Sequence, residues 1–507
     1  MSNRKIILFL LIIFLISYSW GDELHNVSNS PNLNSWRAHL AIDNNGILHA
    51  AWIEFDCSSQ YYCYSKSEDN GEIWLNPMVI TYTQWGNVQA ITIDTDSLGN
   101  PHILFVNYGK IFYTKSDDMG LTWSTPADIF DIPHSGGHGC PRLIISDEDI
   151  LNLVFINSEL LYMTYSVCYS YSEDMGLTWQ EPLKLSELSR RGESPAIALD
   201  LENNPHVVWE ESTAEMQPYE IVYRYFDGNQ WSQKIAVYSN DQLKSLPDIF
   251  LDKEENVHIV WREVWIPRGI FYSVFDGNEW SDPISISEEV GYMEQPVLCC
   301  DSSNNIIVVW QENRGGWDGE KFTEPFRVYF NFSDGNAWYG PTIIEEGPYS
   351  YLWGVKTSIS SDLEDFPHII WSKGDLTEYS REIYHMKFNP YPYIEVPIDI
   401  KPGSYPNSIN LGSQGNVPVA IFSTDDFDAT QVNPSSVTLA GASVKLKGKG
   451  TPMSSFEDIN GDGLLDIVVH VDTTALELSE GDKEAVLEGE TLDGEKIRGV
   501  DTVRIIY

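Results

Sequence analysis

A four-residue phrase that recurs along the chain limits its possible folds more than any other sequence feature. It reads His-x-x-Trp or a close variant, and each copy follows an apolar run and an acidic turn that contains Asn or Gly. The seven copies lie at 49–52, 102–105, 152–155, 206–209, 258–261, 307–310 and 368–371, so their starts are 49 to 61 residues apart. This period is the length of one four-stranded antiparallel sheet, and its repetition predicts a β-propeller made of such blades.

A second phrase follows in six of the repeats and predicts a hairpin turn. It reads Ser-x-Asp-x-Gly-x-(Thr or Ile)-Trp three times and then shortens to Asp-Gly-Asn-x-Trp at 227–231, 276–280 and 334–338. Asp and Ser cap backbone N–H groups, Gly takes a left-handed conformation, and Trp packs between neighbouring sheets. The long copies contain Ser67, Asp69, Gly71 and Trp74; Ser116, Asp118, Gly120 and Trp123; and Ser172, Asp174, Gly176 and Trp179. We expect a structural role for all of them.

These three long copies resemble the Asp-box, or BNR repeat, of the sialidase-like β-propeller superfamily. The resemblance covers roughly residues 22–390 and implies the propeller fold. Enzymes of that family hold a substrate carboxylate with three arginines, use a Tyr assisted by Glu as nucleophile and use an Asp as acid. Arg37, in Trp36-Arg37-Ala38, is nearest in position to the family's Arg-Ile-Pro signature. No catalytic residue is carried over by motif.

The last repeat has three recognisable strands, near 355–360, 368–371 and 382–388, and no second phrase. Residues 24–28 precede the first repeat where an outer strand would end, so they are expected to complete the last blade and close the ring. The predicted fold class is all-β: a seven-bladed β-propeller, with six blades as the alternative, plus a C-terminal β-sandwich-like domain.

The net charge and the amino-terminal segment indicate which partners the protein can have and where it is located. With 75 acidic and 31 basic residues the formal charge is −44, which argues against nucleic-acid or anionic-membrane partners. Residues 1–21 read as a signal peptide, with Arg4 and Lys5 before an apolar run at 6–16 that is too short to span a bilayer. We therefore expect a secreted or cell-surface monomer with no membrane span after cleavage. In such a setting disulfides are permitted, and Cys57 with Cys63 and Cys140 with Cys168 are plausible pairs, whereas the adjacent Cys299 and Cys300 are expected to be buried thiols.

The propeller, at 22–390, is followed by a linker at 391–397 and a β-rich domain at 398–507. The opening of that domain, at 398–410, resembles a module appended to many secreted bacterial and archaeal proteins. One acidic loop carries oxygen ligands at alternate positions, namely Asp458, Asn460, Asp462 and Asp466, with Gly463 for the sharp turn. This pattern predicts a bound Ca²⁺ with a structural role, although the twelfth position is Val469 where an EF-hand has Glu.

Candidate functional residues are expected on the face opposite the second phrase. Four repeats place Glu two residues after Trp, and these carboxylates would either gather at one rim as acids, bases or metal ligands or end their strands in solvent. Arginines in the same region suit an acidic sugar, with pairing to neighbouring glutamates as the alternative. The candidates are Glu54, Arg191, Glu211, Arg262, Glu263, Tyr292, Glu312 and Arg314.

Three functions are consistent with these features. The first is a secreted recognition protein that binds glycan or another extracellular ligand on that face. The second is a glycan-active enzyme, either a sialidase-like exo-glycosidase or a polysaccharide lyase in which His and Tyr transfer protons. The third is a structural or assembly protein of the cell envelope. Convergence of Arg191, Arg262 and Arg314 beside Tyr292 and Glu211 would favour the enzyme, and His134 and His138 are further candidates for a lyase or a metal site.

Overall fold

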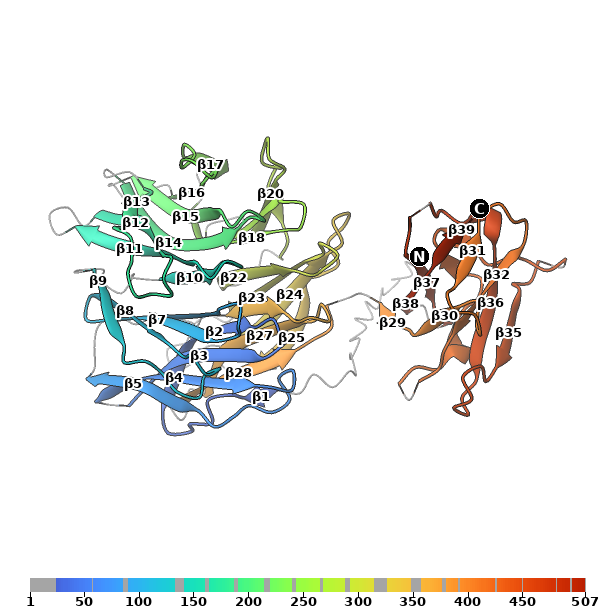
Figure 1. The fold of residues 1–507 in the computed structure, drawn as a ribbon, viewed down its shortest axis with the longest axis horizontal. Helices are drawn as coiled ribbons and strands as arrows, with labels where there is room; N and C mark the ends of the chain where they lie inside the picture. The colour runs from blue at the N-terminus through green and yellow to red at the C-terminus, as the bar shows by residue number, and fades with distance from the viewer. Residues whose placement is uncertain are drawn as a thin grey trace, which may run out of the picture. The chain divides into compact units, whose positions relative to one another are not determined.

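The computed structural model describes residues 24–506 apart from 57, 85–89, 133–140, 160–163, 187–189, 214–218, 239–242, 265–267, 288–291, 314–325, 348–356, 376–379, 391–392, 425, 449, 480 and 493–494. The chain divides into two compact units, Met1–Pro390 and Tyr391–Tyr507 (Figure 1). Apart from two short 3-10 turns, the regular elements of the described residues are β-strands.

Five four-stranded antiparallel sheets follow one another along the first unit, each built from four consecutive strands. They are β6 (Ala90–Thr95), β7 (Pro101–Asn107), β8 (Lys110–Lys115) and β9 (Ala127–Asp131); β10 (Arg142–Ile145), β11 (Leu151–Glu159), β12 (Thr164–Ser172) and β13 (Leu183–Lys184); β14 (Arg190–Leu199), β15 (Pro205–Thr213), β16 (Tyr219–Tyr225) and β17 (Ile235–Tyr238); β18 (Lys244–Leu251), β19 (Val257–Glu263), β20 (Gly269–Phe275) and β21 (Ile284–Ser285); and β22 (Tyr292–Cys300), β23 (Ile306–Asn313), β24 (Phe326–Ser333) and β25 (Thr342–Gly347). Each sheet holds one copy of the repeat, because the His-x-x-Trp phrase occupies its second strand.

An eight-stranded sheet joins the two ends of this unit. The first repeat supplies β2 (Asn34–Ile42), β3 (Leu48–Phe55), β4 (Ser59–Ser67) and β5 (Met78–Gln84), and the last supplies β26 (Ser358–Ser361), β27 (Pro367–Asp375) and β28 (Ser380–Lys387). The two parts meet where β2 pairs with β28 at Asn34 and Arg381. β1 (His25–Asn26) pairs with β28 farther along that strand, at Tyr384 and His385. β1 thus lies where the sequence predicted a strand from the amino terminus, and the chain closes on itself.

Aromatic side chains hold neighbouring sheets together. The tryptophans of the first phrase are buried completely or almost completely, as Trp52, Trp209, Trp261, Trp310 and Trp371 show. The tryptophans of the second phrase pack against a ring in the third strand of the preceding sheet. These pairs are Trp123 with Tyr64, Trp179 with Tyr113, Trp231 with Tyr169, Trp280 with Tyr223, Trp338 with Tyr272 and Trp74 with His385, at centroid distances of 5.0 to 5.8 Å. The packing runs in one direction around the unit and includes the junction between its ends.

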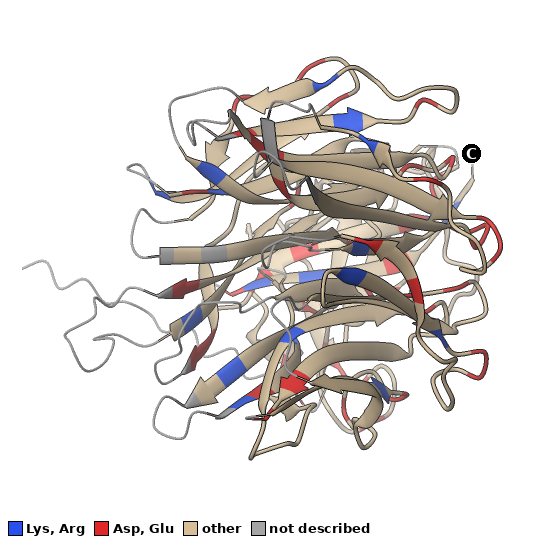
Figure 2. Ribbon diagram, turned by 90° about the vertical axis from the view of Figure 1, so that its left-hand side faces the viewer, with Lys and Arg blue, Asp and Glu red and all other residues tan. Residues whose placement is uncertain are grey.

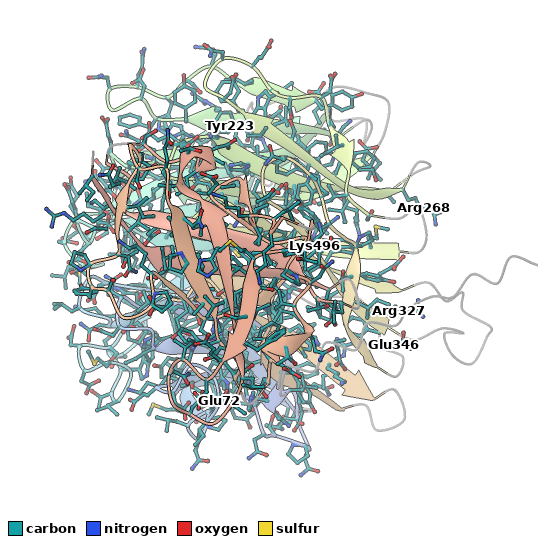
Figure 3. All side chains as sticks on the ribbon, turned by 90° about the vertical axis from the view of Figure 1, so that its right-hand side faces the viewer. Glu72, Tyr223, Arg268, Arg327, Glu346 and Lys496 are labelled. Atoms are coloured by element: carbon teal, nitrogen blue, oxygen red, sulfur yellow. The ribbon has the colours of Figure 1, made fainter. Side chains whose placement is uncertain are left out.

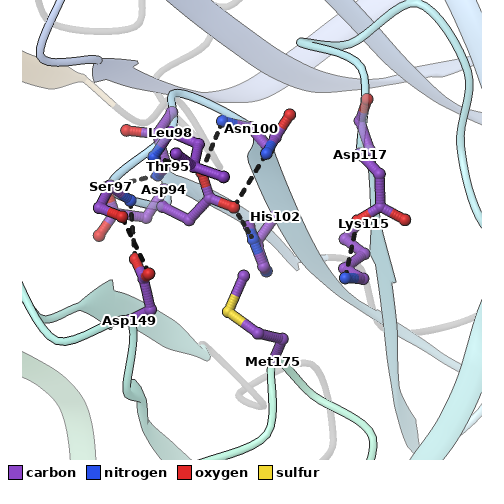
Figure 4. A network of polar contacts seen from close by, with 12 residues as sticks. Asp94, Thr95, Ser97, Leu98, Asn100, His102, Lys115, Asp117, Asp149 and Met175 are labelled. Atoms are coloured by element: carbon purple, nitrogen blue, oxygen red, sulfur yellow. Dashed lines mark hydrogen bonds and ion pairs between the residues drawn. The ribbon is translucent and has the colours of Figure 1, made fainter.

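The histidine of the first phrase fastens the turn before it to the third strand. In the second repeat, His102 Nδ1 lies 2.7 Å from Tyr113 Oη, and Nε2 lies 3.5 Å from Asp96 Oδ2. Figure 4 shows His102 together with Leu98 and Asn100 of the turn that precedes it. Asp96 also accepts from the N–H groups of Leu98 at 3.0 Å and Asn100 at 2.8 Å. The histidines at 49, 206 and 258 make the same contact with Tyr64, Tyr223 and Tyr272. The phrase therefore encodes one buried polar link, repeated along the chain.

The second unit has its own hydrophobic core, in which Ile400, Val419, Ile421, Leu439 and Val469 are fully buried. Three sheets surround it. They contain β29 (Ile394–Glu395), β38 (Lys496–Thr502), β37 (Glu484–Glu490), β33 (Thr438–Leu439) and β34 (Ala442–Ser443); β30 (Ile398–Ile400), β32 (Asn416–Ile421), β36 (Asp466–Asp472) and β35 (Ser454–Glu457); and β31 (Ser408–Asn410) with β39 (Arg504–Ile506).

Candidate functional site

The repeated sheets place their turns at two opposite ends. Because the strands of each sheet are antiparallel and consecutive, the turn after the first strand and the turn after the third lie at the same end. The Asp96 turn and the Ser116–Trp123 segment, for example, both lie at this end, which we call the acidic-turn face. Figure 2 shows Asp and Glu residues in the loops along one edge of the unit. The first strands begin at the other end, which we call the entry face.

The three Ser-x-Asp-x-Gly turns on the acidic-turn face share one set of hydrogen bonds. In the second copy, Ser116 Oγ donates to Asp118 Oδ1 at 2.7 Å and accepts from the Gly120 N–H at 2.8 Å, while Asp118 accepts from the Thr122 N–H at 2.7 Å. The corresponding distances in the copies at 67–74 and 172–179 are 2.8 to 2.9 Å. Gly120 has a φ of +86°, and an added Cβ would lie 2.2 Å from Tyr64 Oη in the preceding sheet. These bonds and contacts position the turns within the fold.

The four glutamates that follow Trp are buried, so they neither form an open rim nor end in solvent. The exposed fractions are 5% for Glu54, 0% for Glu211, 3% for Glu263 and 1% for Glu312. Glu54 accepts from Trp52 Nε1 at 2.8 Å and from the hydroxyls of Ser30 and Ser35 at 2.8 and 3.2 Å. Glu211 pairs with Lys234 Nζ at 2.5 Å. The sequence pattern did not reveal this burial, because neighbouring sheets cover these positions.

Arg262 connects two sheets. Its Nε donates to Ser245 Oγ at 3.1 Å and its Nη1 to the Met293 carbonyl at 3.0 Å, in β22 of the following sheet. Arg191 lies in β14 and Tyr292 in β22, the first strands of their sheets, but their side chains are outside the described residues. Arg314, His134 and His138 are also outside them. The predicted convergence of these arginines therefore stays a prediction.

The first strands of all seven repeats surround an axial cavity of about 220 Å³. Its polar lining includes His39 on β2, Asp94 on β6, Arg142 on β10, Asp248 on β18 and Ser358 on β26. Several of these side chains bond to the backbone of the next repeat: Asp94 accepts from the Ile145 N–H at 2.7 Å and Ser358 from the Leu40 N–H at 3.2 Å. Burial raises the pKa of Asp94 to about 6. The axial residues thus link successive repeats, and the link from Ser358 to Leu40 spans the junction.

A smaller pocket of about 40 Å³ adjoins the cavity, and Arg142 lines both. Three first strands form it with bulges at Ser194-Pro195, Leu246-Pro247 and Gln295-Pro296. The residues before Pro have φ values of 50°, 55° and 39°, and Arg37, in the bulge of β2, has a φ of 56°. These bulges lie in the first halves of their strands, toward the entry face. Left-handed backbone at non-glycine residues is strained, and such strain is concentrated at functional sites.

Arg142 makes no ion pair with any acidic residue that the structure describes, although Asp94 and Asp248 line the same cavity. Its Nη1 lies 3.0 Å from His39 Nε2, which accepts the hydrogen bond. Other cations near this end pair with carboxylates, as Arg327 does with Glu346 at 2.6 Å (Figure 3) and Lys373 does with Glu345. Arg37 precedes His39 by two residues and lies 5.5 Å from the Trp36 ring, again without an acidic partner in the described part of the chain. Arg142 was not a candidate from the sequence. Its position in the repeat could have identified it. Arg142 lies four residues before the turn that follows the first strand, and His39 and Asp248, which line the same cavity, occupy the same position in their repeats.

The acidic loop of the second unit lies between β35 and β36. Asp458 accepts from the N–H groups of Gly461 at 2.7 Å and Gly463 at 3.1 Å, and Asp466 from those of Ile459 at 2.8 Å and Ser423 at 3.0 Å. Asn460 Nδ2 donates to Asp462 Oδ2 at 2.8 Å. In this arrangement no three His, Cys, Asp or Glu side chains converge as metal ligands anywhere in the described residues.

Comparison with known proteins gives the fold. No protein-family model matches the chain, and no curated protein matches it. A solved polysaccharide lyase, the PL25 ulvan lyase bound to -[GlcA(1-4)Rha3S]-, is similar over 72% of this chain and 96% of its own, with a TM-score of 0.53 and 12% identity. A Penicillium chrysogenum α-L-arabinanase (TM-score 0.43, 11% identity, 72% and 99% covered) and a Ruminococcus gnavus intramolecular trans-sialidase (0.38, 12%, 73% and 97%) are more distant. The first unit therefore has a β-propeller fold. None of the described residues forms a helix with the length and apolar character of a membrane span.

Proposed function

We propose that the propeller binds an acidic glycan on its entry face, with Arg142 as the group that recognises the anion. The observation that carries this proposal is the guanidinium of Arg142, which lines both the axial cavity and the pocket of the three Xaa-Pro bulges and has no acidic partner among the described residues. The protein as a whole carries a net charge of −44, so a cation at this position provides a positive charge in a molecule that otherwise repels anions. Guanidinium binds carboxylate or sulfate through two parallel hydrogen bonds, and a partly enclosed site strengthens them.

Two further features support an acidic ligand. Arg37 has no acidic partner in the described chain either, and it lies on the same strand as His39, two residues before it. The ulvan lyase, which shares the fold, is described with a ligand that contains GlcA and Rha3S, a uronate and a sulfated sugar. Recognition is our first choice between binding and catalysis, because the described residues include no complete catalytic set.

Binding to soluble acidic polysaccharides tests the proposal. Ulvan, polygalacturonate and a sialylated glycan would be compared with neutral polysaccharides by calorimetric titration at low salt. We expect at least one acidic glycan to bind, Arg142→Ala to weaken it at least tenfold, and Arg37→Ala to weaken it less. Lys253→Gln, which removes a cation from the acidic-turn face, is the matched control. Equal losses in the Arg142 and Lys253 variants would show that only net charge matters and would refute the site.

A β-eliminating lyase is the second candidate, because a titratable imidazole lies beside the guanidinium. Arg142 would turn from His39 to the uronate carboxylate, which frees the Nε2 lone pair of His39, 3.0 Å away, to take the C5 proton. The C4–O bond then breaks, the C4=C5 double bond forms and the leaving oxygen takes a proton. Appearance of the ultraviolet absorbance of an unsaturated uronate, lost in His39→Ala, would establish this reaction. Acidic glycan that binds but stays intact would leave recognition as the function.

We propose that the seven repeats are seven blades, with β1 as the outer strand of the last one. Support comes from the seven first strands around the axial cavity and from the pairing of His25 with His385. The three Ser-x-Asp-x-Gly turns are then Asp-boxes with a structural role. Deletion of 22–28 is expected to destabilise the whole propeller, whereas an unchanged unfolding midpoint would contradict this closure.

We also propose a location and an oligomeric state for the protein and a metal ion for its second unit. The chain is proposed to be a secreted monomer, which mass analysis of the exported protein tests. The second unit is proposed to be a β-sandwich-like domain in which Asp458, Asn460, Asp462 and Asp466 hold a structural Ca²⁺. All four supply oxygen donors within one loop, which suits a hard cation, but the backbone N–H groups that Asp458 and Asp466 now accept from would have to yield.

A further inference from the structure

The second unit carries a groove of about 330 Å³ on the outward side of the sheet ordered β29-β38-β37-β33-β34. Its side chains come from three strands and from the residue before β29. They include Tyr393, Thr438, Glu488, Glu490, Lys496 and Arg498. The groove is thus built from one aromatic ring, hydroxyls and charges of both signs.

Tyr393 is held in place at one side of the groove. The Arg498 guanidinium lies 5.3 Å from the centre of the Tyr393 ring, and its Nη1 donates to Tyr393 Oη at 3.4 Å. Arg498 also lies 3.8 Å from Glu395, in β29. A ring fixed in this way can stack on a flat apolar surface at little cost in conformational entropy.

The charged side chains beside it do not neutralise one another. Strand register places Glu488 opposite Arg498 and Glu490 opposite Lys496, an arrangement in which ion pairs usually form. Nevertheless Glu488, Glu490 and Lys496 make no side-chain hydrogen bond or ion pair with any residue that the structure describes. Of the three, Lys496 is labelled in Figure 3. Two carboxylates and an ammonium group therefore keep their full hydrogen-bonding capacity next to the tyrosine ring.

We propose that this groove binds a neutral oligosaccharide. A sugar ring presents an apolar face, which suits Tyr393, and a rim of vicinal hydroxyls, which donate to Glu488 and Glu490 and accept from Lys496. The three carboxylates of Glu395, Glu488 and Glu490 outnumber the cations Lys496 and Arg498, so the groove does not favour an anion. This site is independent of the acidic-glycan site proposed for the propeller.

The test uses the full-length protein with Arg142→Ala, so that failure of the propeller site does not affect the result. Hexasaccharides of glucose, mannose, xylose and arabinose would be titrated by calorimetry. We expect at least one to bind with a Kd of roughly 10 μM to 1 mM, Tyr393→Ala and Glu488→Gln each to weaken binding at least tenfold, and Tyr393→Phe to retain it.

The matched control is Glu484→Gln, on the same strand and the same outward face as Glu488 but outside the groove. It should leave the affinity unchanged. The proposal fails if none of the four sugars binds at millimolar concentration, or if Glu484→Gln and Tyr393→Ala weaken binding equally. Thermal unfolding of each variant shows that a loss of binding is not a loss of fold.

Discussion

A cluster of histidines at the junction of the propeller predicts acid sensitivity. His385, in β28, stands where other repeats have Tyr64, Tyr113, Tyr169, Tyr223 or Tyr272. Its Nε2 lies 2.9 Å from His368 Nδ1, and His368 Nε2 lies 3.1 Å from Asp362, which also pairs with Lys387 at 2.7 Å. The His25 ring is 6.1 Å from that of His385. With both histidines neutral, His385 Nε2–H donates to His368, and His368 Nε2–H donates to Asp362.

Protonation of His385 would put a charge where nothing stabilises it. The residue is 1% exposed, and its Nδ1 has no hydrogen-bond partner among the described atoms. Burial first, and then the charges of His368, His25 and Lys387, lower the pKa of His385 well below 6.5. Because this pKa is lower in the folded than in the unfolded chain, the unfolded chain binds the extra proton as the pH falls below about 6.5. Stability is then present above that pH and is lost below it, with a limiting slope of about 1.4 kcal/mol per pH unit for one such histidine.

The perturbation is His385→Tyr, which restores the residue of the other repeats and allows its hydroxyl to bond to His368. Urea unfolding would be followed by tryptophan fluorescence between about pH 4.5 and pH 7.5. Burial also lowers the pKa of His206, His258 and His368, so wild type loses stability steeply toward acid. In the variant, the free energy of unfolding should fall less steeply with decreasing pH, and the difference in slope should correspond to about one bound proton. His25→Gln, at the edge of the cluster, is the control. An identical slope in wild type and His385→Tyr would refute the reasoning.

Three further predictions follow from the contacts. Gly120→Ala should lower the free energy of unfolding by about 2 kcal/mol or more, because an added Cβ would meet Tyr64. The control Gly277→Ala, at φ +91° with open space around it, should lower it by only about 1 kcal/mol. Equal effects of the two substitutions in denaturant titrations would contradict this prediction. Arg262→Ala should destabilise the propeller by about 2 kcal/mol, because it loses one bond within its own sheet and one bond to the following sheet. It should leave acidic-glycan affinity unchanged in the calorimetric titrations, and a loss of affinity in a folded variant would place Arg262 in the site. Chelation of Ca²⁺ should lower the melting temperature of the second unit in calorimetry and should do nothing in Asp462→Ala; identical melts with and without chelator would exclude a structural ion.

The repeat could be predicted from sequence because each copy encodes local contacts. The His-x-x-Trp phrase specifies a buried strand and its link to the turn before it, and Ser116, Asp118 and Gly120 bond within one hairpin. The site was harder to predict, because its geometry arises between repeats. Arg142 and His39 are far apart in the chain and meet only because their strands line one axis. Glu54 and Glu211 resemble strand ends in sequence, yet the adjacent sheets bury them.

The direction in which the aromatic pairs run has a consequence for assembly. Five of the six hairpin tryptophans pack against the repeat synthesised before them, so their docking partners are already in place. Only Trp74 must wait, because its partner His385 belongs to the final repeat. The propeller can therefore close only after its last repeat has been made, and until then the first and last repeats each keep one uncovered flank.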